Sequence, residues 1–137
     1  MGLYVTRIRR FVAAIAVGVG LSVGVASAHH SQSAYEATKS VTIVGTLKAI
    51  SWANPHSLFF VEARLFDAPE SPVQRWNVEG PSPRQLESAG WTRADAKVGE
   101  HITMTGRPRR DGKSDLLLTG LVTAAGKSIN LRPDGTQ

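Results

Sequence analysis

The segment from Val41 to Trp52 constrains the fold most, because its hydrophobic pattern is that of a long, bent β-strand. Apolar residues first occupy one parity, at Val41, Ile43, Leu47 and Ala49. The parity then changes, since Ile50 and Trp52 continue it on the even positions. Alternation of this kind indicates a half-buried strand. The change of parity, together with Gly45 in mid-strand, predicts a bulge or sharp coil of the kind with which a small barrel bends a strand.

Four further segments with alternating apolar residues predict four more strands. The first follows a turn at Asn54-Pro55-His56, because the residue before a proline is kept out of the helical region. The strands are expected at Leu58–Phe66, at Gln74–Glu79, around Ile102 and Met104, and at Leu116–Ala124, with a short edge strand reaching Leu131.

A single short helix is predicted between the third and fourth strands. Ser82 is a suitable N-cap, Pro83 suits the first helical position, and Gln85 completes a capping box. Gly90 ends the helix after about two turns as a C-terminal cap. Trp91 follows and is expected to fold back onto the barrel, as core or lid rather than as a stacking platform.

Three strands, a short helix and two strands are the element order of an OB-fold, a five-stranded Greek-key barrel. The sequence therefore predicts a mainly β protein with a small OB-fold-like barrel. A different five- or six-stranded barrel or an open β-sandwich is the alternative, because element order does not fix strand pairing.

The N-terminal residues have the pattern of an export signal. Three arginines at positions 7, 9 and 10 precede an uncharged stretch at 11–25, and Ala26-Ser27-Ala28 is a small-x-small triplet. The apolar stretch is shorter than the roughly 20 residues of a spanning helix, so cleavage after Ala28 is favoured over an uncleaved anchor. The protein is therefore expected in the periplasm or outside the cell.

Cleavage changes both the length and the charge of the chain. It removes 28 of 137 residues and leaves 109, enough for one domain with a single core. The expected parts are the signal at 1–28, a polar and loosely held arm at 29–40, the barrel at 41–131 and a polar tail at 132–137. The formal charge falls from +5 to +2, because residues 1–28 carry three arginines and no acid. A charge this small does not indicate nucleic-acid binding.

The sequence contains no cysteine, which excludes disulfides, thiolate metal sites and thiol nucleophiles. It also lacks a nucleophile elbow, a His-Glu-x-x-His helix and a phosphate-binding glycine loop. The carboxylates of Glu62, Glu79 and Glu87 lie in separate elements, and spacing pairs none of them. A binding role is therefore favoured over an enzyme.

The histidines suggest a metal site. Cleavage after Ala28 would give His29 a free α-amine beside its imidazole, and His30 or His56 could add another imidazole. Amine and imidazole nitrogens suit copper(II), and zinc or nickel less distinctively. In the alternative reading, His29 and His30 are ordinary polar residues and His56 hydrogen-bonds a loop carbonyl.

A second candidate site follows from the predicted fold, because the loops after the first and fourth strands flank the ligand face of an OB-fold. Here they carry Trp52, Asn54, Arg107, Arg109 and Arg110. Such a rim suits an anionic ligand such as a glycan, a lipid headgroup or an acidic protein. The alternative is a solvated basic hairpin, with Trp52 in the core.

The mature sequence resembles a family of small secreted bacterial proteins known only as a domain of unknown function, DUF6152. The similarity extends over nearly all of the mature chain. The residues that carry it are Ala28-His29-His30-Ser31, Val44-Gly45-Thr46, Trp52-Ala53-Asn54-Pro55-His56, Trp76, Glu79-Gly80, Gly90-Trp91, Val98-Gly99-Glu100 and Gly106-Arg107-Pro108. The resemblance implies no activity, substrate or cofactor.

The sequence thus yields two functional hypotheses. In the first, the protein is an exported, non-enzymatic binding or accessory protein that holds copper or another divalent metal through His29, His30 and His56. In the second, it is an interaction module that docks an anionic partner through the basic loop after the fourth strand.

Overall fold

A computed structural model describes residues 32–131 of the chain. The predicted signal at 1–28, the histidines at 29 and 30, and the tail at 132–137 lie outside the described residues. The chain divides into two units, at 1–33 and 34–137, and the fold lies in the second. Among residues 32–131, no helix is long and apolar enough to cross a bilayer.

Six strands and the helix α3 follow one another from Val41 to Asn130. In order they are β1 (Val41–Ser51), β2 (Leu58–Leu65), β3 (Gln74–Glu79), α3 (Pro83–Ser88), β4 (His101–Pro108), β5 (Asp115–Thr123) and β6 (Ser128–Asn130).

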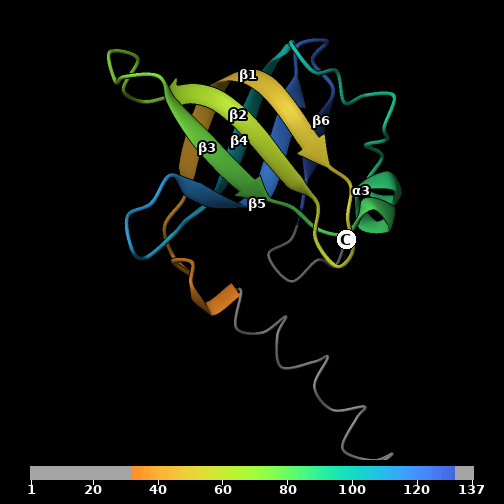
Figure 1. The fold of residues 1–137 in the computed structure, drawn as a ribbon, viewed down its shortest axis with the longest axis horizontal. Coiled ribbons are helices and arrows are strands. Elements are labelled where there is room, and N and C mark those ends of the chain that lie inside the picture. Colours follow the sequence, from red (N-terminus) through yellow and green to blue (C-terminus); the bar gives the residue numbers. More distant parts are fainter. Residues whose placement is uncertain (1–31, 132–137) are drawn as a thin grey trace, which may run out of the picture. The chain divides into compact units, whose positions relative to one another are not determined.

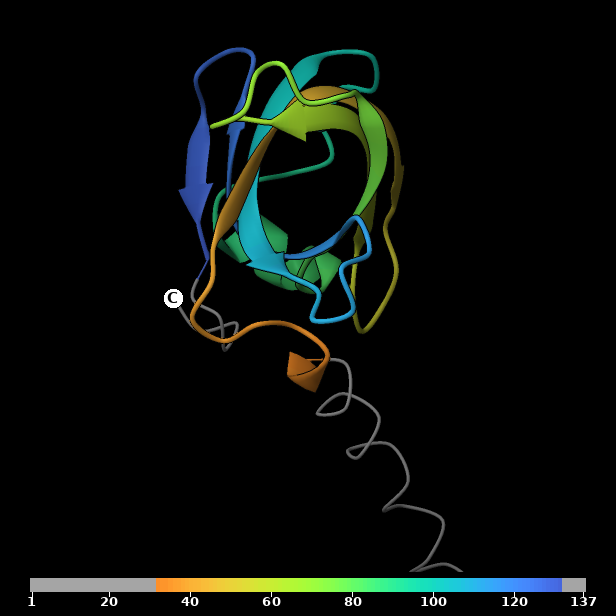
Figure 2. The same ribbon diagram turned by 90° about the vertical axis from the view of Figure 1, so that its left-hand side faces the viewer.

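The strands close into a barrel. The sheet order is β3-β2-β1-β4-β5-β6, and β3 also pairs with β5, which joins the first five strands into a ring (Figures 1 and 2). All neighbours are antiparallel except β3 and β5, which run parallel from Asn77–Asp115 to Glu79–Leu117. The short β6 adds to the free part of β5. The predicted five-stranded barrel, with its helix between the third and fourth strands, is confirmed.

The bend in β1 lies one residue earlier than the sequence pattern indicates. Leu47 pairs with Val61 and Ala49 pairs with Phe60, so Lys48 is the extra residue of a bulge. Ala49 was expected on the inward parity, but it is exposed, because the bulge has already reversed the facing of the strand.

Gly45 permits the close approach of β1 to β2. A Cβ atom at this position would overlap the backbone carbonyl oxygen of Glu62 and lie 2.5 Å from the Cα atom of Ala63. No other residue type fits here unless the two strands separate.

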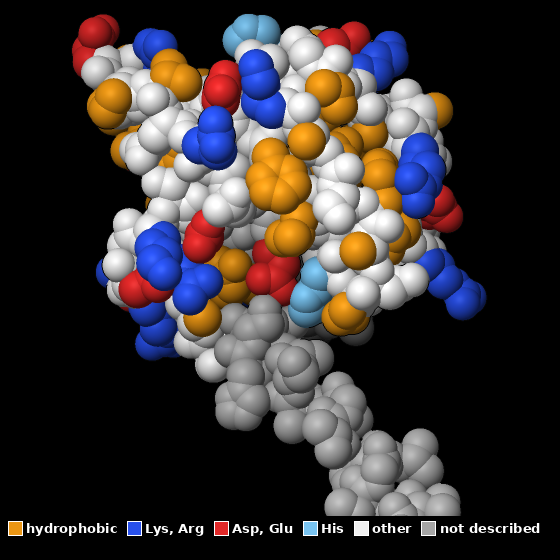
Figure 3. All heavy atoms as spheres, viewed as in Figure 1, with side chains coloured by type: hydrophobic (Ala, Val, Ile, Leu, Met, Phe, Trp, Pro, Cys, Tyr) orange, Lys and Arg blue, Asp and Glu red, His pale blue; other side chains and the backbone are white. Residues whose placement is uncertain are grey.

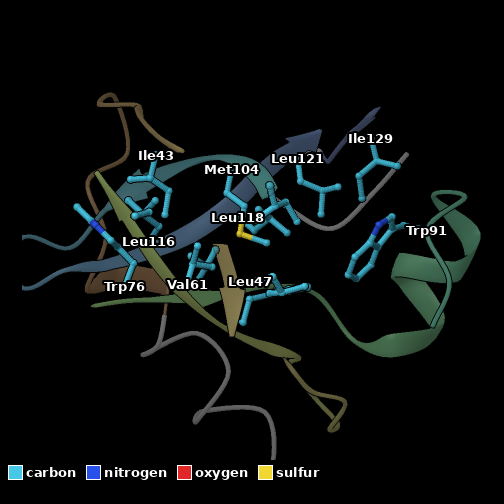
Figure 4. Packing of buried hydrophobic residues seen from close by; sticks show 14 of the residues in the cluster. Ile43, Leu47, Val61, Trp76, Trp91, Met104, Leu116, Leu118, Leu121 and Ile129 are labelled. Carbon is cyan, nitrogen blue, oxygen red and sulfur yellow. The ribbon is translucent and has the colours of Figure 1, made fainter. Parts of the chain in front are cut away.

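The core fills the barrel with alternate residues of every long strand. Figure 4 shows this packing, and its fully or almost fully buried members include Ile43, Leu47, Phe59, Val61, Val78, Met104, Leu116 and Leu118. Trp76 is 7 % exposed and Trp91 is 0 % exposed, as expected for core residues.

α3 begins and ends as the sequence predicts. The Ser82 hydroxyl accepts from the backbone N–H of Gln85, whose side chain accepts from the backbone N–H of Ser82. At the other end Gly90 has φ +89°, and the backbone N–H of Trp91 donates to the carbonyl of Leu86 at 2.9 Å. This C-cap turns the chain so that Trp91 enters the core.

The prediction of a loosely held arm is wrong for the residues around Tyr35. Tyr35 is 5 % exposed and forms an isolated antiparallel bridge with Arg109. The contact could not be predicted from the polar composition of the arm, because a single aromatic residue, Tyr35, accounts for most of the apolar surface that the arm buries.

Candidate functional site

The side chain of Glu79 connects two segments that lie far apart in the sequence. Glu79 ends β3 and is half-buried on the outer parity of that strand. Its Oε1 atom lies 2.7 Å from Nδ1 of His56, and its Oε2 atom accepts a hydrogen bond of 3.1 Å from the hydroxyl of Tyr35. A single carboxylate therefore holds an imidazole from the β1–β2 loop (residues 52–57) and a phenol from the N-terminal arm.

The pairing of β2 with β3 places His56 beside this carboxylate. Leu58 is opposite Glu79 in the ladder. The ladder continues one step further, since the backbone N–H of Gly80 donates to the carbonyl of Ser57 at 2.8 Å and that of Ser57 donates to Pro81 at 3.1 Å. His56 is thus the first loop residue beyond a paired backbone. The Asn54–Pro55 peptide bond in the same loop is cis.

The β4–β5 loop (residues 109–114) holds Tyr35 from the other side. The backbone N–H of Arg110 donates to the carbonyl of Ala34 at 2.9 Å, and that of Glu36 donates to Pro108 at 2.9 Å. The Nε atom of Arg110 donates to the carbonyl of Tyr35 at 3.0 Å. The arm is therefore fixed by its own backbone as well as by the phenol.

The surroundings of Tyr35 keep its hydroxyl protonated. Burial raises the pKa of Tyr35 well above its ordinary value, and the charge of Glu79 and the hydrogen bond to it raise it further. A neutral phenol beside a carboxylate can only donate, so this contact has a fixed direction. The site is thus a carboxylate with one defined donor on Oε2 and an imidazole on Oε1.

This arrangement orients the imidazole of His56. When the neutral ring donates its Nδ1–H to Glu79, Nε2 keeps its lone pair and can bind a metal ion. The His56 side chain is 28 % exposed, so that nitrogen lies within reach of solvent. Figure 3 shows a histidine beside acidic side chains on the face that the view presents. No group of three or more His, Cys, Asp or Glu side chains suited to a metal occurs within residues 32–131.

Two of the three basic residues predicted to form a rim, Arg109 and Arg110, have partners in the structure. Arg109 Nε lies 2.9 Å from Asp111 Oδ2, and Arg109 Nη1 lies 3.5 Å from Asp115 Oδ2. The hydrogen bond to Asp111 raises the pKa of Arg109. Arg110 is bonded to the arm, and Arg107 is half-buried at the end of β4. Part of the positive charge of this loop is therefore balanced within the loop.

Trp52 packs against the segment that follows α3. Its ring stacks on Trp91 with centroids 5.4 Å apart and planes inclined by 24°, and the guanidinium of Arg93 lies 4.8 Å from its centroid. Trp52 is half-buried against the core, and Asn54 is exposed. His56 and the β4–β5 loop are thus connected through Glu79 and Tyr35, whereas Trp52 has a separate set of contacts.

The sequence patterns did not single out Tyr35 or Glu79 as site residues. Glu79 has the outward parity typical of a solvated strand residue, and its neighbours depend on strand register. One feature of the sequence could have indicated a role for Tyr35. An aromatic residue in an otherwise polar arm is expected to pack against another surface.

Comparison with known proteins identifies the family but no function. The model of a family described as a family of unknown function, DUF6152, matches residues 18–118. No curated protein matches the chain. The match covers well over half of the sequence and includes Tyr35, His56 and Glu79. The chain therefore belongs to the DUF6152 family.

Proposed function

We propose that this chain is an exported, non-enzymatic binding protein, and that His56 is one ligand of a divalent metal site that prefers copper(II). The 2.7 Å contact between His56 Nδ1 and Glu79 Oε1 carries the proposal. Metal-binding histidines commonly donate their second ring N–H to a carboxylate, which fixes the tautomer and raises the basicity of the coordinating nitrogen.

His29 and His30 would complete the site. If the signal is cleaved after Ala28, His29 offers an α-amine and an imidazole, and His30 offers a second imidazole. Together with Nε2 of His56 these groups form a nitrogen set, which favours copper(II) among the common divalent ions. The α-amine has a pKa near ~7.7–8, so binding should weaken on mild acidification.

The first experiment tests the amino terminus. Mass spectrometry of the exported protein should show a chain that starts at His29, and this chain should bind copper(II) tightly in a titration. A variant with one extra residue before His29 loses the chelating amine and should bind much more weakly. Equal binding by both chains, or no binding by the native one, would contradict the proposed site.

The second experiment tests the described residues. His56→Ala removes a ligand, and Glu79→Gln removes the carboxylate that orients it, which costs roughly 10- to 100-fold in affinity at comparable sites. His101→Ala is the matched control, because His101 is exposed at the start of β4. Loss of affinity in all three variants, or in none, would show that copper binding does not use His56.

The basic β4–β5 loop supports an alternative proposal, the docking of an anionic partner. Arg109 and Arg110 would then exchange their contacts with Asp111, Asp115 and the arm for contacts with the partner. Heparin is a suitable probe. Its binding should fall steeply with salt and with Arg109→Ala plus Arg110→Ala, and salt-insensitive binding would count against this alternative.

A further inference from the structure

We propose that a groove on the outer face of β4, β5 and β6 binds a neutral sugar ring. The groove has a volume of about 160 Å³ and lies where β6 continues the sheet beyond β5 (Figure 2). Every residue that lines it is uncharged. It shares no residue with the proposed copper site or with the basic β4–β5 loop, so it is a further site that depends on neither.

The register of three strands builds the groove. Two rows of three residues run across the sheet on this face, and in each row a residue of β5 lies between a polar residue of β4 and a polar residue of β6. The rows are Thr105–Gly120–Asn130 and Thr103–Val122–Ser128. Because neighbouring strands lie about 4.8 Å apart, the polar side chains form two rims about 10 Å apart, with the glycine and the valine between them.

Gly120 leaves the floor of the groove open. A glycine weakens the interior of a strand, and it often marks a place where another backbone or a ligand comes close. At Gly45 and Gly106 the cause is a neighbouring strand, since a Cβ atom there would overlap a backbone carbonyl oxygen. At Gly120 the nearest atoms to such a Cβ would be 3.3 Å away, and φ is not positive. The fold therefore needs this glycine less than the other two, and the close approach of a ligand accounts for it.

The two rims carry groups that can recognise hydroxyls. The Thr105 hydroxyl already bonds the Thr42 hydroxyl at 2.9 Å. Within residues 32–131, the hydroxyls of Thr103 and Ser128 and the amide of Asn130 have no such partner. A hydroxyl both donates and accepts, and an amide offers two donors and an acceptor. The rims can therefore bond to ligand hydroxyls in either direction.

A sugar ring fits this lining better than a charged or an aromatic ligand does. Its hydroxyls project from the edge of the ring toward the two rims, while its C–H groups can pack on Val122, which is 41 % exposed. A charged ligand would find no opposite charge among the lining residues, and a nucleobase would find no aromatic ring to stack on. The groove is smaller than the ~300–1,000 Å³ of sites that enclose a drug-sized ligand, so it suits one ring of a glycan.

Nuclear magnetic resonance of the isotope-labelled mature protein tests the groove. The probes are three neutral trisaccharides, namely maltotriose, cellotriose and triacetylchitotriose. At least one of them should shift the backbone amide signals of Gly120, Val122 and Ser128, and the shifts should saturate as the sugar concentration rises.

Two substitutions test the floor and one rim separately. Gly120→Ala places a methyl group on the floor and should abolish the saturable shifts. Thr103→Val replaces a hydroxyl by a methyl group and should weaken binding about fivefold, the effect of one neutral hydrogen bond. Thr103→Val keeps the test decisive if Gly120→Ala does not fold. Thr46→Val is the matched control, because Thr46 lies on β1 opposite His101 and outside the groove, and it should bind as the native chain does.

Two results would overturn the sugar site. One is the absence of saturable shifts at the groove with all three sugars, and the other is equal affinity in the native chain, Gly120→Ala and Thr103→Val. Heparin tests the class of ligand, and it should leave the groove signals unchanged because every lining residue is uncharged. If heparin shifts these signals and the sugars do not, the groove takes an anionic ligand and the proposal fails.

Discussion

His56 and Glu79 lie 23 positions apart in the sequence, and Nδ1 of the first lies 2.7 Å from Oε1 of the second. The contact depends on the register of β2 against β3, which puts Leu58 opposite Glu79 and leaves His56 one step beyond the paired backbone of Ser57. A shift of one residue in that register would turn the Glu79 side chain toward the barrel interior. The candidate site is therefore a consequence of the barrel and not of the loop alone.

The stacked rings of Trp52 and Trp91 predict how the end of the barrel responds to mutation. Trp91 is fully buried and also packs against Phe59 at 5.4 Å. Trp91→Ala should lower the free energy of unfolding by about 3–5 kcal/mol, because the cavity it leaves lies in the core. Urea denaturation measures this, with Val98→Ala, at a residue 61 % exposed, as a control expected to change it by less than ~0.5 kcal/mol. Equal effects of the two substitutions would show that Trp91 is not a core residue.

Gly45→Ala should be among the most damaging small substitutions in the chain. Its methyl group would overlap the backbone of Glu62 and Ala63, which can yield only if β1 and β2 separate. Gly120→Ala is the matched control, because its nearest neighbours lie 3.3 Å away and one of them is the Asn130 side chain. Thermal unfolding followed by circular dichroism should show a much larger fall in Tm for Gly45→Ala. A similar Tm for both variants would contradict the close approach.

The ion pair between Asp95 and Lys127 predicts a dependence of stability on acid. The hydrogen bond from Lys127 at 2.8 Å, followed by those from Thr92, lowers the pKa of Asp95 from 3.8 to about 2. A carboxyl with a lower pKa in the folded state stabilises the fold above its unfolded pKa, and that stabilisation is lost as pH falls through the folded value. Asp95→Asn should therefore be less stable than the native chain at neutral pH, and the difference should disappear between about pH 4 and pH 2.

Urea denaturation across that range measures the effect. Glu70→Gln, at an exposed position of the β2–β3 loop, should follow the native curve. A constant difference between Asp95→Asn and the native chain down to pH ~2 would show that the stabilisation does not come from the charge of Asp95.

Tyr35 predicts the opposite dependence, at alkaline pH. Its pKa is raised above the ordinary value of 10.0, first by burial and then by Glu79. The fold therefore favours the neutral phenol, and this stabilisation is complete below pH ~10 and decreases as the pH rises further. Tyr35→Phe has no such group, so its stability should fall less between pH ~9 and ~11. Chemical denaturation at the two pH values checks this, and parallel loss in both proteins would count against the buried contact with Glu79.

The barrel could be predicted because its signals are local. Alternation, the capping box at Ser82 and Gln85, and the C-terminal cap at Gly90 each depend on only a few neighbouring residues. The order of the predicted elements then matched that of an OB-fold. The exact bulge could not be predicted, because Ala49 suits either face of a strand. The structure places the reversal at Lys48.

The candidate site could be predicted only in part. His56 was identified because histidine is rare in this chain and follows a recognisable turn. Glu79 and Tyr35 were not predicted as site residues. Their contacts depend on which strands pair and on where the arm docks, and no local sequence pattern indicates either. The same limit applies to Arg109 and Arg110. The sequence predicted that they form an exposed basic rim, whereas in the structure Arg109 contacts Asp111 and Asp115, and Arg110 donates to the arm.

The most direct test of the central claim is electron paramagnetic resonance of the mature protein loaded with one equivalent of copper(II). The proposed site predicts a spectrum with several nitrogen ligands. His56→Ala should remove one imidazole coupling, and an extra residue before His29 should remove the amine. His101→Ala should leave the spectrum unchanged. A native spectrum identical to that of His56→Ala would contradict the proposed site, because Glu79 would then orient an imidazole that binds no metal.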